Sequence, residues 1–371
     1  MLTERQELKI GLFNKGVNIS EDARFAMGGV DKNPISTSDY ASTSGLALNL
    51  GEGIFVNTPF MDNNPNFVAE DTPYLLDFDG DHFIVRTNER EVQVQYIPVP
   101  GYWDKSNQKG IPYKLLAVTH IDRVRISPVE GCAIACQFCN LPYEFKYKKH
   151  EVGDLVDSVR EAVEDEILPA QHVLISGGTP RSEDYDYENS VYRQISSTFP
   201  GLDVDIMMAP VDNLLDPKIL KEYGIHGLSI NLELFNSGIA KKKARGKYNI
   251  GRDKYLDFIA SCSNVFGQGR IRSLLMVGIE PMEDTLRGVE ALAERGCDPV
   301  LSPFRPDLAT PLKEEIPPSI EFQKETFLRA REIVDRYPGV VLGPRCIPCQ
   351  HNTLAFPDKS GSFYAHAYKK L

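Results

Sequence analysis

Residues 122–140 read DRVRISPVEGCAIACQFCN, a strand-like segment that leads directly into a loop with three cysteines. Apolar residues alternate with arginine along its first half, which is the pattern of a β-strand rather than of a helix. Residues 152–168 then show the spacing of an amphipathic helix, and strand and helix patterns keep alternating toward the C-terminus. This alternation predicts parallel strands joined by helical crossovers.

Six strand-and-helix pairs follow one another in this part of the chain. The expected strands are residues 122–129, 172–178, 204–210, 226–234, 271–280 and 298–306. The expected helices are residues 152–168, 187–199, 216–224, 251–267, 283–296 and 321–337. Such a series predicts an α/β fold in which the strands close into a partial or full (β/α) barrel. Ligands of such barrels bind at the C-terminal ends of the strands.

Composition divides the chain into three segments. Residues 1–120 are rich in Asn, Asp, Gly, Ser and Pro, and are expected to form a mostly β-rich or irregular leader. Residues 121–315 are expected to form the barrel core. Residues 316–371 are expected to add a C-terminal helix, a short strand at 339–343 and an extension that contains a CxxC pair.

The bulk properties indicate a cytoplasmic protein that acts on small substrates or on protein partners. Its 371 residues are 42% hydrophobic and 25% charged, as in ordinary globular proteins. The formal net charge of −11 argues against nucleic-acid binding, which requires clustered basic residues. The sequence predicts neither a membrane span, for lack of about 18 consecutive apolar residues, nor a secretory signal. The seven cysteines favour metal ligands and buried thiols over a disulfide framework.

Three of these cysteines, Cys132, Cys136 and Cys139, lie in one short loop with CxxxCxxC spacing. Three thiolates so spaced can hold three corners of a 4Fe–4S cluster and leave the fourth iron open to another ligand. Gly131 allows a sharp turn out of the strand, and Phe138 offers apolar cover to the sulfurs. Two alternatives are buried thiols with coincidental spacing and a zinc site, although zinc usually takes four ligands.

The cysteine loop and three later segments resemble the radical S-adenosylmethionine (SAM) superfamily, over residues from about 122 to 310. Residues 176–180, SGGTP, resemble the GGE(P) motif that contacts the SAM amino group, with Thr179 in place of the usual acid. Residues 231–233, NLE, stand where the family places polar groups against ribose and methionine. Residues 277–280, VGIE, resemble the adenine contact. The resemblance thus implies the SAM-binding residues Gly177, Gly178, Thr179, Asn231, Glu233, Gly278 and Ile279.

The resemblance also implies a fold, a chemistry and partners. The barrel would be of the radical SAM type, and the enzyme would cleave SAM reductively to a 5′-deoxyadenosyl radical that takes hydrogen from a small-molecule substrate. A flavodoxin- or ferredoxin-type protein would supply the electron. Within the superfamily, residues 231–312 resemble the biotin-synthase-related and lipoyl-synthase-like branch. The reaction could be sulfur insertion, a rearrangement, a lyase step or C–C bond formation.

Three basic residues are further candidates for binding anionic groups. Arg245 and Lys247 follow the fourth strand and could pair with the SAM carboxylate, although a solvated basic loop is equally compatible with the sequence. Glu233 stands in an apolar context, so a ligand hydroxyl or a nearby cation is expected beside it. Arg305, at the end of the sixth strand, could bind a carboxylate or phosphate of the substrate, or form a salt bridge in the barrel mouth.

Cys346 and Cys349 form the CxxC pair near the C-terminus. They could ligate an auxiliary iron–sulfur cluster or a zinc ion, or act as a redox pair. Cys262 and Cys297 follow apolar helical patterns and are expected to be small buried side chains. His150, His172 and His226 are isolated in the sequence and are expected to be structural.

Two other functions stay open at this stage. A radical SAM methyltransferase would use the same cysteine loop and would release S-adenosylhomocysteine. A non-catalytic iron–sulfur or zinc protein, such as an assembly module, would need the cysteines but not the SGGTP and VGIE segments at strand ends.

Overall fold

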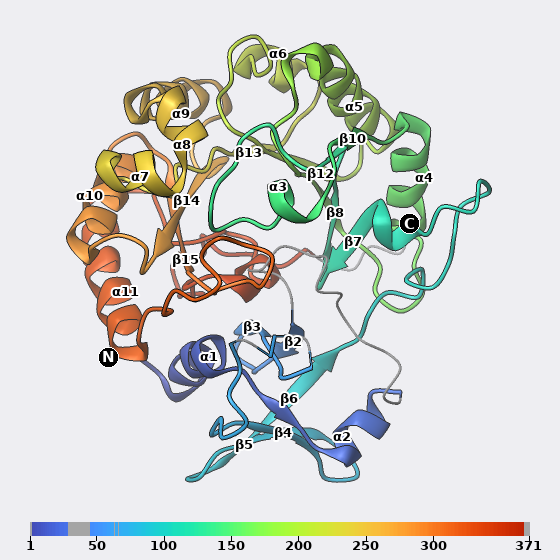
Figure 1. Cartoon of the computed structure of the whole chain (residues 1–371), viewed down its shortest axis with the longest axis vertical. Helices are drawn as coiled ribbons and strands as arrows, with labels where there is room; N and C mark the ends of the chain where they lie inside the picture. Colours follow the sequence, from blue (N-terminus) through green and yellow to red (C-terminus); the bar gives the residue numbers. More distant parts are fainter. Residues whose placement is uncertain (1, 29–44, 63, 66, 367–371) are drawn as a thin grey trace.

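The computed structural model describes residues 2–28, 45–62, 64–65 and 67–366 of the chain. In the view of Figure 1, a curved sheet surrounded by helices fills the upper part of the molecule. A second sheet, formed by the N-terminal part of the chain, lies below it.

The upper sheet has seven strands in the order β15-β14-β13-β12-β11-β8-β7. The strands are β7 (Ala117–His120), β8 (Arg123–Ile126), β11 (His172–Ile175), β12 (Asp203–Met207), β13 (Gly227–Ser229), β14 (Ile271–Val277) and β15 (Asp298–Pro303). The six strands from β8 to β15 are parallel, as predicted, whereas β7 adds an unexpected antiparallel edge beside β8. Among the described strands, β7 and β15 do not pair, so the barrel is partial rather than full.

Helices cover the outer face of this sheet. The helices after the cysteine loop are α4 (Val152–Val163), α5 (Tyr185–Thr198), α6 (Pro217–Glu222), α7 (Ser237–Lys243), α8 (Arg245–Ile250), α9 (Arg252–Phe266), α10 (Met282–Ala293) and α11 (Ile320–Val334). Leu155, Val159 and Ala162 form one buried stripe on α4 and illustrate the predicted helical spacing. No helix of the described residues combines the length and the apolar character needed to cross a membrane.

The parallel strands form because both of their faces are buried. Every residue of β8, β11 and β15 is buried, which is typical of parallel strands between a helical layer and a filled interior. Val173 and Ile175 of β11 are fully buried, and each such side chain stabilises the fold by about 1.5–3 kcal/mol.

The lower sheet has six strands in the order β1-β4-β5-β6-β2-β3. These strands are β1 (Asn18–Ile19), β2 (Leu46–Asn49), β3 (Phe55–Thr58), β4 (Leu75–Phe78), β5 (Phe83–Arg86) and β6 (Glu91–Ile97). Two helices, α1 (Glu4–Lys15) and α2 (Glu21–Ala26), accompany the sheet and were not predicted. Thr3 and Gln6 form a capping box at the start of α1, and this T-x-x-Q pattern is the signal that could have revealed it.

The C-terminal segment runs beneath the barrel and contacts the N-terminal helix. Lys9 of α1 is fully buried and donates hydrogen bonds to the carbonyls of Gln350 (2.8 Å) and Ala355 (2.9 Å). The short 3-10 helix η3 (Pro348–Asn352) lies in this segment. The strand predicted at 339–343 is absent, because Gly339 and Gly343 both have positive φ angles (77° and 113°) that interrupt an extended conformation.

The remaining short elements lie in the loops. They are the 3-10 helices η1 (Tyr113–Leu115) and η2 (Ser182–Asp184), the helix α3 (Leu141–Glu144) and the antiparallel pair β9 (Val129–Glu130) and β10 (Lys148–Lys149).

Candidate active site

The cysteine loop is closed at its base by a two-residue β ladder. β9 precedes the loop, β10 follows it, and Glu130 pairs with Lys148. Gly131 turns the chain out of β9 with φ 72°, and a Cβ atom there would lie about 3.0 Å from the amide nitrogen of Tyr147. The sharp turn predicted at Gly131 is therefore present, and it directs the loop over the C-terminal end of the sheet.

The three sulfurs of this loop share one environment. Cys132, Cys136 and Cys139 are free thiols that line the same cavity. Burial raises the pKa of all three thiols, to about 12 for Cys139. Neutral thiols are therefore favoured in the protein alone, and a positively charged partner such as an iron cluster is needed to hold all three as thiolates.

Apolar side chains pack against the cysteine loop. Phe138 is buried beside Cys136 in a small cluster with Leu234, Phe304 and Leu312. The backbone amide of Ile134 donates to Cys132 Sγ at 3.3 Å. Such cover and hydrogen bonding suit a metal–thiolate site, so the donor set fits a cluster with three cysteine ligands.

The SGGTP segment packs directly against the cysteine loop. The amide of Thr179 donates to Cys132 Sγ (3.2 Å), and the carbonyl of Thr179 accepts from the amide of Ala133 (2.9 Å). A Cβ atom on Gly178 would lie 2.7 Å from the Cα of Cys132 and closer still to the carbonyl oxygen of Gly131. Gly178 thus allows the two backbones to approach, while Gly177 and Thr179 line the cavity.

The cavity lies at the C-terminal ends of the parallel strands and holds about 210 Å³ of solvent-accessible space. Ser176, Met207 and Met276 contribute to its walls from the ends of β11, β12 and β14. The position agrees with the site expected for a (β/α) barrel.

One polar group in the cavity wall follows strand β13 in the sequence. It consists of Asn231, Glu233 and Lys247. Lys247 Nζ lies 2.9 Å from Glu233 Oε2 and donates to the carbonyl of Asn231 at 2.7 Å. Burial by itself would lower the pKa of Lys247, but the Glu233 carboxylate outweighs burial and raises that pKa above its usual value. The cation expected beside Glu233 is therefore Lys247, and the two charges compensate one another.

Glu233 also has an unusual backbone conformation. Its φ angle is 67°, in the left-handed region that non-glycine residues rarely adopt. Two backbone hydrogen bonds to strand β14 stabilise this conformation. The amide of Glu233 donates to the carbonyl of Leu274, and the amide of Met276 donates to the carbonyl of Glu233, both at 2.8 Å. Backbone strain of this kind is often found at functional sites, where the surroundings enforce it.

Four of the predicted SAM contacts lie outside the cavity lining, namely Gly178, which packs against the cysteine loop, and Arg245, Gly278 and Ile279. Arg245 is exposed at the start of α8. Gly278 has φ 99° and approaches Pro318 so closely that a Cβ would lie 2.7 Å from its ring. Ile279 packs against the small apolar cluster that contains Cys136. The carboxylate of Glu280, in the same segment, accepts from the backbone amide of Asn236 (2.8 Å) and so serves the local structure.

Arg305 enters the cavity from the end of β15. Its guanidinium is buried and contacts the carbonyl and side-chain oxygens of Asn57, both at 3.4 Å, from the N-terminal sheet. Among the residues that the structure describes, no carboxylate lies within ion-pair distance of Arg305. The salt bridge considered from the sequence is therefore absent there. Arg123 and Arg125 of β8 line the same cavity and add to its positive charge.

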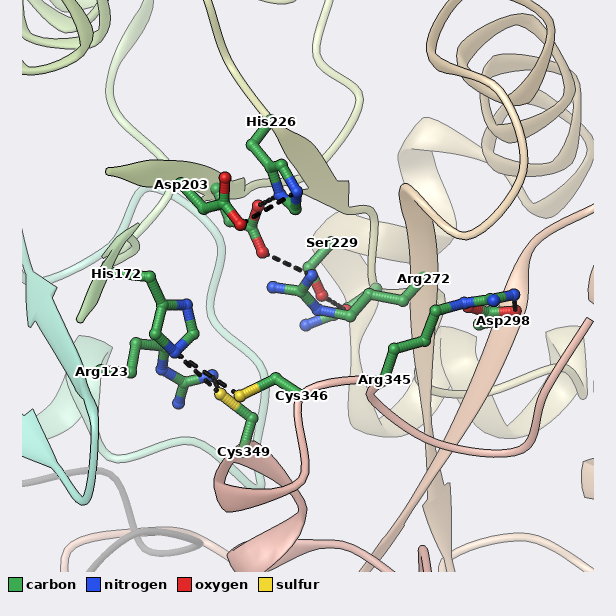
Figure 2. A network of polar contacts seen from close by, with 12 residues as sticks. Arg123, His172, Asp203, His226, Ser229, Arg272, Asp298, Arg345, Cys346 and Cys349 are labelled. Carbon is green, nitrogen blue, oxygen red and sulfur yellow. Dashed lines mark hydrogen bonds and ion pairs between the residues drawn. The ribbon is translucent and has the colours of Figure 1, made fainter. Parts of the chain in front are cut away.

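Cys346 and Cys349 lie away from the cysteine loop, at the N-terminal end of the strands (Figure 2). His172, the first residue of β11, places Nε2 at 3.5 Å from Cys349 Sγ and 3.7 Å from Cys346 Sγ. Asp122, just before β8, lies beside them. His172 is isolated in the sequence, but the adjacent parallel strands β8 and β11 bring it beside Arg123 and the residue before it, Asp122.

The other two histidines contact carboxylates. His226 lies 2.9 Å from Asp205 and 3.2 Å from Asp203 at the same end of the sheet, and Figure 2 shows it beside Asp203. His150 lies 3.2 Å from Glu130 near the base of the cysteine loop. Cys262 and Cys297 are fully buried, as expected for small core side chains.

Comparison with known proteins identifies a family for the central part of the chain. Residues 126–303 match the radical SAM superfamily. A search of curated proteins finds no match. Solved structures with similar folds include the FeFe-hydrogenase maturase HydG from Carboxydothermus hydrogenoformans, at 16% identity and TM-score 0.46. They also include a radical SAM methyltransferase from Sphaerobacter thermophilus, at 14% identity and TM-score 0.46.

The extent of these structural matches differs. The alignment with the maturase covers 59% of this chain and 53% of the maturase, so only about half of that protein is matched. The alignment with the methyltransferase covers 73% of this chain and 76% of the other. Streptococcus suis SuiB, solved with the precursor peptide SuiA, matches at 14% identity and TM-score 0.44, over 61% of this chain and 49% of SuiB.

The family match begins at the last residue of β8, ends at the last residue of β15, and includes the whole cysteine loop. That family uses a 4Fe–4S cluster together with SAM, which agrees with the donor set of three thiols. Residues 126–303 therefore form a radical SAM domain on a partial (β/α) barrel, and such a domain indicates an enzyme.

Proposed function

We propose that this enzyme removes a hydrogen atom from a small anionic substrate bound in the cavity at the C-terminal ends of the barrel strands. The observation that carries the proposal is the composition of that cavity. Cys132, Cys136 and Cys139 line it together with Arg305, a buried cation that no described carboxylate neutralises. A cofactor site and a substrate-binding group thus share one confined space.

Cys132, Cys136 and Cys139 would hold the 4Fe–4S cluster through their sulfurs. When bound, the cluster and SAM supply the reductive cleavage that generates a 5′-deoxyadenosyl radical, which is able to attack unactivated C–H bonds. The contribution of the chain itself is to bind, to orient and to exclude water. The apolar cluster around Phe138 and the packed SGGTP segment support this exclusion on the protein side.

Glu233 and Lys247 are proposed to organise the SAM end of the cavity. Their ion pair is preformed at 2.9 Å, and the backbone conformation of Glu233 fixes the direction of its carboxylate. Asn231, whose side-chain oxygen accepts hydrogen bonds from Ser229 (2.8 Å) and from the amide of Leu274 (3.2 Å), is held rigidly beside them. Rigid polar groups bind a ligand at a lower cost in ordering than mobile ones do.

Arg305 is proposed to bind the anionic group of the substrate. A buried guanidinium that pairs with no carboxylate of the described residues is costly, and its contacts with Asn57 are long at 3.4 Å. A carboxylate or phosphate could accept two parallel hydrogen bonds from the guanidinium and would remove that cost. We infer that the substrate carries such a group, and that the N-terminal sheet helps to position Arg305 for it.

We further propose that the enzyme belongs to the biotin-synthase-related and lipoyl-synthase-like branch, on the strength of the sequence similarity over residues 231–312. The electron would come from a flavodoxin- or ferredoxin-type protein in the cytoplasm. The organisation into a leader (1–120), a core (121–315) and an extension (316–371) remains our proposal, with β7 of the leader segment joining the sheet of the core.

The test begins with anaerobically reconstituted protein, dithionite and SAM. Release of 5′-deoxyadenosine by the unmodified chain, and its loss in Cys136→Ala, is the expected result. Release of S-adenosylhomocysteine instead would indicate a methyltransferase, and intact SAM with a fully assembled cluster would indicate a non-catalytic iron–sulfur protein. Both results contradict the proposal.

The substrate proposal has its own test. Cell metabolites separated into anionic and neutral fractions are added to the same assay. The anionic fraction should stimulate 5′-deoxyadenosine formation by the unmodified chain, and Arg305→Gln should lose this stimulation but keep the basal cleavage of SAM. Stimulation by the neutral fraction alone would refute the role given to Arg305.

A further inference from the structure

Four buried side chains of metal-binding type converge at the end of the barrel opposite to the cavity. Asp122, His172, Cys346 and Cys349 each offer one ligand atom, and these atoms all lie within 4.8 Å of one another. Figure 2 shows His172 directed at the two sulfurs from β11, while the cysteines come from the C-terminal segment. The chain brings them together from sequence positions more than 170 residues apart.

Four of their six separations are close to the edges of a tetrahedron around a single metal ion. Zinc bonds of about 2.3 Å to sulfur and 2.0–2.2 Å to nitrogen or oxygen give ligand-to-ligand distances of about 3.3–3.8 Å. His172 Nε2 lies 3.7 Å from Cys346 Sγ, 3.5 Å from Cys349 Sγ and 3.3 Å from Asp122 Oδ1. The same Oδ1 of Asp122 lies 3.9 Å from Cys346 Sγ. The two remaining separations, from Cys349 Sγ to Cys346 Sγ and to Asp122, are at most 4.8 Å, so contraction by up to about 1 Å would complete the coordination.

The charges also favour a divalent cation. Two thiolates and a carboxylate carry three negative charges at a site where all four ligands are buried. Arg123 donates to Cys349 Sγ at 3.4 Å and supplies one positive charge. A divalent ion would bring the group to neutrality, which a buried site requires.

A second layer of contacts holds the carboxylate in place. His366 Nδ1 lies 3.4 Å from Asp122 Oδ2, and its Nε2 lies 3.3 Å from Asp203. The ring of His366 stacks on that of His172, with 4.3 Å between the centroids. Outer groups of this kind orient the ligands of metal sites and strengthen binding.

We propose that Asp122, His172, Cys346 and Cys349 bind one zinc ion in a closed, structural site. Four protein ligands fill a tetrahedral shell and leave no position for a substrate, which distinguishes structural from catalytic zinc. The site attaches the C-terminal segment to the first residues of β8 and β11, at the end of the barrel that commonly serves stability. None of the four ligands lines the radical SAM cavity, although Arg123 lines that cavity and also contacts Cys349. The zinc site does not depend on the function proposed above.

The ligand types favour zinc over the other occupants considered for the CxxC pair. A 4Fe–4S cluster is normally held by cysteine thiolates, and this group has only two. A redox disulfide would use the two sulfurs alone, and would leave the carboxylate and the imidazole beside them without a role. The mixed sulfur, nitrogen and oxygen set is a usual one for zinc.

The experiment measures metal content in the full chain with Cys132, Cys136 and Cys139 all replaced by alanine, so that the radical SAM loop cannot bind metal. Elemental analysis after growth with zinc should find about one zinc ion per chain. Replacing Cys349 by alanine in the same background should remove it, whereas the matched change of the buried core residue Cys262→Ala should retain it. Zinc retained in the Cys349 variant would refute the site.

Binding of Co²⁺, followed by its absorption spectrum, is a second test that needs no substitution in the proposed zinc site. The chelator-treated background protein should take up about one Co²⁺ and develop the intense visible bands of tetrahedral cobalt, with thiolate-to-cobalt charge transfer in the near ultraviolet. No uptake of zinc or cobalt, a disulfide between Cys346 and Cys349, or a brown iron–sulfur chromophore after reconstitution would each overturn the proposal. None of these outcomes alters the test of SAM cleavage.

Discussion

Two adjacent glycines in the SGGTP segment give a matched pair of substitutions with opposite expected outcomes. A Cβ on Gly178 would lie 2.7 Å from Cα of Cys132, about 1 Å inside ordinary contact, with the carbonyl oxygen of Gly131 nearer still. Both obstacles are backbone atoms, so no side-chain rotation relieves them. A Cβ on Gly177 would meet its nearest neighbour, the carbonyl oxygen of Val129, at 3.3 Å.

Gly178→Ala is therefore expected to displace the cysteine loop and to cost about 3 kcal/mol, the upper end of the usual range for overpacking. The displacement also breaks the hydrogen bond from the amide of Thr179 to Cys132 Sγ. Iron and sulfide per chain after anaerobic reconstitution should fall sharply, and the thermal unfolding midpoint should drop. Gly177→Ala should keep both values near those of the unmodified chain.

Equal iron content and equal unfolding midpoints in the two alanine variants would refute this reasoning. They would mean that the close approach of the SGGTP segment does not set the position of the cysteine loop. Gly177 lines the cavity, so a loss of SAM affinity in Gly177→Ala with normal iron content remains compatible with the account.

The remaining predictions concern charged side chains in the interior. Glu233→Gln should weaken SAM binding more than it weakens cluster assembly, and unchanged SAM affinity in equilibrium dialysis would contradict this. The same change leaves the cation of Lys247 without its partner, so it should also lower the free energy of unfolding by up to about 3 kcal/mol. Lys9→Met should cost about 1–3 kcal/mol in urea unfolding, because two buried carbonyls lose their donor, whereas exposed Lys15→Ala should change stability by less than about 0.5 kcal/mol. Burial holds the pKa of Lys9 well below its ordinary value of 10.5, so below pH 10.5 the unfolded chain binds a proton on Lys9 that the folded chain binds less readily. The contribution of Lys9 to the free energy of unfolding therefore rises with pH until it levels off near pH 10.5. The advantage of the unmodified chain over Lys9→Met should accordingly grow between neutral pH and about pH 9.5, and a decrease over that range would be inconsistent with the buried amine.

The sequence predicted the barrel because the signals for its strands are local. Residues 172–175 and 298–303 are continuous buried runs that need both faces covered, and amphipathic helices follow them at regular intervals. The cysteine loop could also be identified from the sequence, since its three thiols lie within eight residues. Periodicity and short spacing therefore sufficed for the fold and for the cluster ligands.

Features that depend on tertiary contacts were not predictable in the same way. Asp122 and His172 approach Cys346 only because β8 and β11 are adjacent and the C-terminal segment passes beneath them. The segment 339–343 has strand-forming residues, but its two glycines at positive φ prevent a strand. The partner of Lys247 was one of several open possibilities until the loop after β13 placed Glu233 beside it.

The most direct test of the central claim is electron paramagnetic resonance of the reduced, reconstituted protein with SAM labelled isotopically at its amino nitrogen. We expect a hyperfine coupling between that nitrogen and the cluster, because three cysteines leave one iron free to bind it. The coupling should disappear in Cys136→Ala. A cluster signal that SAM leaves unchanged, with no coupling to the labelled nitrogen, would contradict the account.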